Sequence, residues 1–341
     1  MSSGSMRPYL ARHATPLTLA GLVTVVGIAL PGWLGYRLAV TQSALLPPVP
    51  VEQGVAEMRL GTASSGGLAV APRKIAALPV APDTLDTLLG VFERYDYRLA
   101  TLREGARGVP PIFVETFPAD WSKLKGGDQR KRLFVKTVLP LILKANAEIR
   151  FERRQLLVIE SDAGGDLAAV PPAARDWLDG LAARYGLEAP DFAALKRRVD
   201  EIPVSLALAQ AANESGWGTS RFAREGNALF GQWTWNPAEG MRPKEMRAEK
   251  GSYAVKKFDT LGQSVAGYMA NLNRHGAYAP LRERRAARRA AGQPISGSAL
   301  AAGLIKYSER GQDYIDEIRA MIQHNKFQDF DEAALGSAAL G

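Results

Sequence analysis

One acidic residue in this 341-residue chain lies where a charged side chain is unexpected. Residues 202–215 read IPVSLALAQAANES, and their apolar side chains recur at the spacing of a helix that begins at Pro203. Gly216 or Gly218 should end this helix, because glycine accepts the left-handed conformation of a helix stop. The sequence therefore places Glu214 in the last turn of an apolar helix.

This position predicts an unusual acid. Desolvation and the negative end of the helix dipole both favour the neutral form of Glu214, so we expect its pKa to rise. A carboxylic acid that stays protonated near neutral pH can act as the general acid in cleavage of a glycosidic bond. The alternative is a solvated helix-end residue, which is the usual situation of a glutamate.

Glycines and aromatic residues alternate in the segment around and after Glu214. They are Gly216, Gly218, Gly226 and Gly231, together with Trp217, Phe222, Phe230, Trp233 and Trp235. Glycines allow a ligand to approach the backbone closely, and aromatic rings are the usual surface for the faces of sugars. This combination favours a carbohydrate cleft over an ordinary turn.

Residues 209–231 resemble the signature of the glucosaminidase family (glycoside hydrolase family 73). The elements that carry the resemblance are Ala209–Gln210, Glu214–Gly218, Ser220 and Asn227–Gly231. The resemblance extends to about Ile322, and the larger arrangement is similar to the Bax-type subgroup of bacterial membrane-associated proteins. The family cleaves the glycan strands of peptidoglycan, so the resemblance implies this partner for the chain.

The resemblance also implies a fold and a reaction. The expected fold is mainly α (α+β), with a lysozyme-like helical core and a small β-hairpin. The expected enzyme is an endo-β-N-acetylglucosaminidase that cuts between N-acetylglucosamine and N-acetylmuramic acid, with Glu214 protonating the leaving oxygen. A lytic transglycosylase or muramidase, or a peptidoglycan-binding scaffold without turnover, stays open.

A second carboxylate would lie in the polar segment after Phe230. Glu239, Glu245 and Glu249 are candidates, and we predict Glu249, because it precedes a strand-like stretch and its separation from Glu214 resembles the family spacing. Retaining, inverting and acetamido-assisted mechanisms all remain open. The predicted substrate-binding residues are Trp217, Asn227, Phe230, Trp233, Tyr307 and Tyr314.

Composition limits the other possibilities. The chain has no cysteine and only three histidines, which argues against a metal site, and we expect no cofactor. It contains neither a phosphate-binding glycine-lysine loop nor a recognised nucleic-acid module, so we expect no nucleic-acid partner. The net charge of +8 suits an anionic partner such as peptidoglycan or a phospholipid surface.

The chain divides into six predicted parts. They are a cytoplasmic N-terminus (1–13), a transmembrane anchor (14–40), a flexible linker (41–82), a helical region (83–200), the glucosaminidase domain (201–330) and a frayed tail (331–341). The anchor predicts a single-pass inner-membrane protein with its catalytic domain in the periplasm. A cleaved signal peptide and a buried core helix are the alternative interpretations of the apolar segment.

Several elements should position the site. We expect one helix from Asp83 and a second from about Asp128 that is kinked or split at Pro140. Two short helices on either side of residues 186–190 should lead into the core. A loop or small hairpin should follow Phe230, and the arginine-rich stretch 281–292 is predicted to be a solvated helix face.

Overall fold

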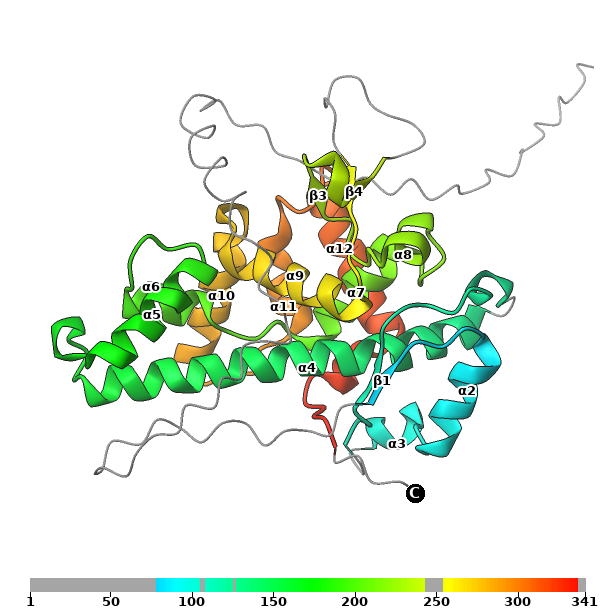
Figure 1. Cartoon of the computed structure of the whole chain (residues 1–341), viewed down its shortest axis with the longest axis horizontal. Coiled ribbons are helices and arrows are strands. Elements are labelled where there is room, and N and C mark those ends of the chain that lie inside the picture. The colour runs from blue at the N-terminus through cyan, green and yellow to red at the C-terminus, as the bar shows by residue number, and fades with distance from the viewer. Residues whose placement is uncertain (1–77, 105–107, 125–126, 243–253, 337–341) are drawn as a thin grey trace, which may run out of the picture.

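The computed structural model describes residues 78–104, 108–124, 127–242 and 254–336 (Figure 1). The predicted anchor, residues 14–40, and most of the predicted linker lie outside these ranges. Among the described helices, none is both long enough and apolar enough to cross a bilayer.

The described part is mainly helical, as predicted. Its α-helices are α2 (Leu85–Arg94), α3 (Leu99–Arg103), α4 (Gly127–Asp162), α5 (Pro172–Arg184), α6 (Phe192–Arg198), α7 (Val204–Ser215), α8 (Arg221–Gly226), α9 (Leu261–Arg274), α10 (Ala279–Ala290), α11 (Gly297–Leu300) and α12 (Gln312–His324). Its strands are β1 (Leu78–Val80), β2 (Ile112–Val114), β3 (Trp233–Thr234), β4 (Gly240–Met241) and β5 (Ala254–Lys256).

Helix α4 is one continuous helix of 36 residues, so the predicted kink or split at Pro140 is wrong (Figure 1). A proline inside a helix removes one backbone hydrogen bond and costs about 3 kcal/mol. Here the cost is offset by packing, because Pro140 and the residues on all sides of it, from Val138 to Leu143, are buried. Helix α4 contacts α7, α9 and β2, and so it packs against several of the other elements of the domain.

The region before α4 also differs from the prediction. The single helix expected from Asp83 is divided into α2 and α3, because Asp96 has a left-handed backbone (φ 43°) that ends helical geometry. Thr84 caps α2 by accepting a hydrogen bond from the Thr87 N–H. Strands β1 and β2 form a parallel pair that the sequence did not indicate, and β1 falls at the end of the predicted linker.

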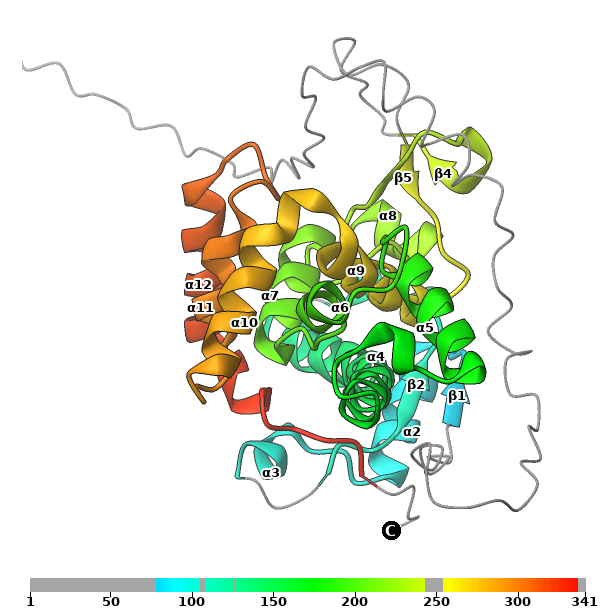
Figure 2. The same ribbon diagram turned by 90° about the vertical axis from the view of Figure 1, so that its left-hand side faces the viewer.

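The apolar interior is divided into two clusters. The larger one surrounds α7, which Figures 1 and 2 show inside the domain, in contact with α4, α11 and α12. The smaller one joins the C-terminal half of α4 to α5 and α6, the two short helices that the sequence predicted. Trp177 packs at its edge.

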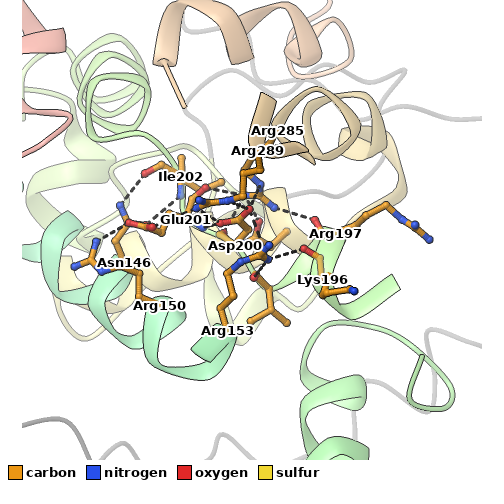
Figure 3. Close-up of polar contacts among 12 residues, drawn as sticks. Asn146, Arg150, Arg153, Lys196, Arg197, Asp200, Glu201, Ile202, Arg285 and Arg289 are labelled. Atoms are coloured by element: carbon orange, nitrogen blue, oxygen red, sulfur yellow. Dashed lines mark hydrogen bonds and ion pairs between the residues drawn. The ribbon is translucent and has the colours of Figure 1, made fainter. Parts of the chain in front are cut away.

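A buried charged junction links these two clusters just before α7 (Figure 3). The Asp200 carboxylate is 2% exposed and lies 2.6 Å from the guanidinium of Arg289. Arg285 and Arg153 approach the same carboxylate at 3.6 Å and 3.7 Å. Arg285 also donates to the backbone carbonyls of Asp200 and Glu201, and so it helps to satisfy the buried polar groups of this junction.

The arginine-rich helix α10 is therefore not simply a solvated face, and that prediction is wrong for part of it. Arg285 is fully buried and Arg282 is 5% exposed. Arg282 donates to the carbonyls of Leu272 and His275, at the end of α9. Burial lowers the pKa of Arg285 to about 10, which still leaves it charged at neutral pH. Sequence periodicity cannot distinguish such arginines from solvated ones, because their partners are backbone carbonyls that lie outside α10.

The start of α7 is tied to two other elements. Asn146 of α4 exchanges two hydrogen bonds with the backbone of Ile202. The Asp331 carboxylate accepts hydrogen bonds from the backbone N–H and the hydroxyl of Ser205, in the first turn of α7. The tail was predicted to begin at Asp331 and to be frayed. Residues 331–336 are instead ordered, with Gly336 donating to the carbonyl of Val109.

The segment after Phe230 forms a small antiparallel sheet, which bears out the prediction of a β element there. Its strand order is β3-β5-β4, so it has three strands rather than the two of a hairpin. Strand β5 coincides with the strand-like SYAVKKF stretch, and it pairs with both neighbours. In Figures 1 and 2 the sheet projects from the top of the helical body.

Candidate active site

Helix α7 presents Glu214 as the sequence predicted. The helix is buried on all sides from Val204 to Ala212, and it ends at Gly216, whose left-handed backbone (φ 57°) caps the last turn. Glu214 lies in that turn and is only 8% exposed. The alternative interpretation of Glu214 as a solvated helix-end glutamate is therefore excluded.

The surroundings of Glu214 favour its protonated form. Burial raises the pKa of Glu214 from its ordinary value of 4.5 to about 7, and the nearby Glu317 carboxylate adds to the rise. Hydrogen bonds from Tyr314 and Asn213, and the charge of Arg310, act in the opposite direction without cancelling it. A carboxyl group in this state can give up a proton near neutral pH.

A chain of buried hydrogen bonds leads to Glu214. The Tyr268 hydroxyl donates to Oε1 of Gln210 at 2.7 Å, and Nε2 of Gln210 donates to the Tyr314 hydroxyl at 3.0 Å. The Tyr314 hydroxyl in turn donates to Oε1 of Glu214 at 2.8 Å. The chain joins α9, α7 and α12, so three elements far apart in sequence determine the environment of one carboxylate.

Aromatic rings surround this chain. Tyr307 stacks on Tyr314 with ring centroids 5.3 Å apart and an interplanar angle of 13°. Phe230 stacks on Tyr268 at 3.8 Å and 6°. The Tyr307 hydroxyl donates to the backbone carbonyl of Phe230 at 3.3 Å, which connects the two stacks. The structure thus brings Tyr307, Tyr314 and Phe230 together around Glu214.

Three other residues predicted to bind substrate have their own local contacts. Trp217 packs against Phe134 of α4 and Phe327, at the edge of the larger apolar cluster. Asn227 has a left-handed backbone, and its amide donates to the carbonyls of residues 258 and 259, so it holds the chain that follows β5. Trp233 lies in β3 opposite Val255. A role in binding for these three stays a prediction.

The second carboxylate is not placed. Glu249, the predicted residue, and Glu245 lie outside the described residues. Glu239 bonds to Asn236 at 2.9 Å and lies 3.8 Å from Lys256, with its side chain 53% exposed, as expected for a solvated turn. The described carboxylate that acts electrostatically on Glu214 is Glu317 of α12, which the sequence analysis did not single out.

Two residues of the site were missed. Gln210 was noted only as part of a motif, although it lies four residues before Glu214 and therefore on the same face of α7. An amide on the same helix face as a buried acid is a signal that could have found it. Tyr268 had no such signal, because only the packing of α9 brings it to α7. No cluster of three or more metal-ligating side chains occurs among the described residues.

Comparisons with known proteins agree with this geometry. The profile of the family named Glucosaminidase, described as mannosyl-glycoprotein endo-beta-N-acetylglucosaminidase, matches residues 189–327. The chain is also 35% identical over 213 residues to "Protein bax" of Escherichia coli (strain K12), which covers 61% of this chain and 74% of that protein. The chain belongs to the glucosaminidase family. No solved structure matches it.

Membership in the glucosaminidase family supports a glycosidase that acts on peptidoglycan in general terms. The matched residues include the whole of α7, with Glu214, and the tyrosines of α9 and α12 that surround it. The lysozyme-like character of the helical core stays a prediction.

Proposed function

We propose that the chain is an endo-β-N-acetylglucosaminidase that hydrolyses the bond between N-acetylglucosamine and N-acetylmuramic acid in peptidoglycan strands. Glu214 is the general acid. It donates its proton to the glycosidic oxygen as the bond to the anomeric carbon breaks, and water then adds to that carbon.

The observation that carries the proposal is the state of Glu214. The side chain is 8% exposed at the C-terminal end of α7, and burial raises its pKa to about 7. A structural glutamate gains nothing from such a position, since the negative end of the helix dipole and the loss of hydration both disfavour its charge. A proton donor requires this state, and the ring of Tyr307, which is only partly buried, is of the kind on which sugars stack.

Glu249 is proposed as the second carboxylate, because it precedes the strand-like stretch and its separation from Glu214 resembles the family spacing. It would act as a nucleophile or base, or it would stabilise the oxocarbenium-like state if the acetamido group of the substrate attacks instead.

The test is digestion of purified peptidoglycan, with mass spectrometry of the products. Glucosaminidase action leaves a reducing N-acetylglucosamine end, whereas a muramidase leaves reducing N-acetylmuramic acid and a lytic transglycosylase leaves a product one water lighter. Glu214→Gln should lower the rate by about 10²–10⁴-fold. Glu225→Gln, at a side chain 53% exposed on α8, is the matched control and should retain activity. Activity of Glu214→Gln close to that of the unaltered chain would refute the assignment.

The same assay separates the remaining alternatives. A folded chain that binds peptidoglycan without cutting it would be a scaffold. Glu249→Gln should cost more activity than Glu239→Gln if Glu249 is the second catalytic group.

The location proposed for this activity is the periplasm, with residues 14–40 as an inner-membrane anchor. The uncharged stretch from Ala14 to Tyr36 and the arginines before it support this orientation. A reporter fused after Val80 tests it.

A further inference from the structure

The hydrogen-bond chain to Glu214 has a direction that the hydrogen-bonding groups themselves dictate. An amide nitrogen can only donate, so the Tyr314 hydroxyl must accept from Nε2 of Gln210. The single proton of that hydroxyl is then left to point at Oε1 of Glu214, 2.8 Å away.

Tyr268 fixes which way round the Gln210 amide lies. Its hydroxyl is buried, and among the contacts of the described residues its acceptor is Oε1 of Gln210, at 2.7 Å. If the Gln210 amide were turned over, Nε2 of Gln210 would face Tyr268, and the hydroxyl proton of Tyr268 would have no acceptor in Gln210. An unsatisfied buried donor is costly, and so the observed direction is favoured over the reverse one.

We propose that Gln210 is a positioning residue that makes Tyr314 a donor to Oε1 of Glu214, and thereby places the acid proton of Glu214 on Oε2. An oxygen that already accepts the Tyr314 proton acts as the carbonyl oxygen of the acid. Oε2, which takes no part in the hydrogen-bond chain, then carries the proton that is transferred. This inference deepens the proposed function and rests on it for the identity of the acid.

The hydrogen-bond chain from Tyr268 to Glu214 also affects how readily Glu214 ionises. Burial raises the pKa of Tyr314, and the hydrogen bond from Gln210 acts against this rise, which makes Tyr314 a better donor. Several titratable or charged groups face Glu214 from the packed elements. They are Tyr268, Tyr278, Tyr307, Arg310, Tyr314 and Glu317. Of these, Tyr314 alone joins Glu214 to Gln210.

The test uses Gln210→Met in the full-length chain. Methionine keeps the length of the side chain and removes both hydrogen-bonding groups. We expect kcat on peptidoglycan to fall by about tenfold with KM within about twofold, because positioning of the proton is lost while binding is retained. The alkaline limb of the pH profile should move upward by a few tenths of a pH unit, since weaker donation to the carboxylate favours the neutral acid.

Two further variants distinguish a positioning role of Gln210 from a purely structural role. Tyr268→Phe removes only the hydroxyl that holds the amide, and it should shift the pH profile in the same direction by a smaller amount. Gln155→Met removes another buried amide, on α4 next to Leu156 of the smaller apolar cluster, and should leave the pH profile unchanged. If the profiles of Gln210→Met and Tyr268→Phe match that of Gln155→Met, Gln210 is a packing residue and the proposal is wrong.

A readout without turnover separates this inference from the proposed function. Unfolding free energy is measured against pH for the unaltered chain and Gln210→Met, each with and without Glu214→Gln. The pH-dependent difference due to Glu214 should be centred at higher pH in Gln210→Met, and should vanish in both proteins that carry Glu214→Gln. If the chain has no glycosidase activity, the proposed function fails, and this measurement alone decides the role of Gln210. Unshifted curves would overturn it.

Discussion

Replacing Glu214 by glutamine should change how the stability of this protein depends on pH. Glutamine keeps the shape of the neutral acid and can still accept the hydrogen bond from Tyr314. Below pH 4.5 the glutamate is protonated in both the folded and the unfolded chain, so the two proteins should differ little from one another. Between pH 4.5 and 7 the unfolded glutamate ionises while the folded one, whose pKa is raised to about 7, remains protonated.

The sign and size of the effect follow from these two pKa values. A raised pKa in the folded state means that the stability contributed by Glu214 is complete below pH 4.5 and is lost as the pH rises through 7. At about 1.4 kcal/mol per pH unit, the gap corresponds to about 3 kcal/mol. Relative to Glu214→Gln, the unaltered protein should therefore lose about 3 kcal/mol of unfolding free energy between pH 4 and pH 8.

The measurement is urea unfolding followed by circular dichroism, at pH steps from 4 to 8, for both proteins. Other titrating groups are common to both and cancel in the difference. Glu225→Gln controls for the loss of one carboxylate. A difference that stays flat to within about 0.5 kcal/mol would show that Glu214 is hydrated in solution. A difference of the opposite sign would show that hydrogen bonds, rather than burial, dominate its environment, and either result would refute the reasoning.

Two other predictions concern the ends of the molecule. Asp331→Ala should lower the free energy of unfolding by about 2 kcal/mol, because the Asp331 carboxylate caps the first turn of α7 through Ser205. The control Glu332→Ala, at an exposed neighbouring residue, should change the free energy of unfolding little. Equal effects of the two substitutions in urea unfolding would argue against the cap. An alkaline phosphatase reporter fused after Val80 should be active, because that site is expected in the periplasm. A fluorescent protein that does not fluoresce after export should be dark when it is fused at the same site. The opposite pattern would refute the proposed orientation of the anchor.

The sequence determined a good deal about α7. Its apolar composition, Pro203 at its start and Gly216 at its end are local properties, and they sufficed to predict the helix, its stop and the burial of Glu214. The ordered motif from Ala209 to Gly231 sufficed to indicate the family. The strand-like stretch that became β5 was also readable, because its strand-favouring residues are a local signal.

Other features depended on tertiary structure. The continuity of α4 through Pro140 depends on packing around that proline, which propensity does not contain. The buried Arg285 of α10 has the backbone carbonyls of Asp200 and Glu201 as partners, and these lie about 85 residues away in sequence. Similarly, the ordering of residues 331–336 follows from contacts with Ser205 and Val109 that no local pattern predicts.

The division is clearest at Glu214 itself. The sequence alone placed an acid at the end of an apolar helix and predicted that its pKa would rise. Only the folded chain brings Tyr268 of α9 and Tyr314 of α12 to Gln210 of α7, and so only the structure shows which hydroxyl donates to which oxygen. Helical periodicity determines which residues share one face of a helix, whereas the direction of a hydrogen-bond chain depends on groups that approach that face from other helices.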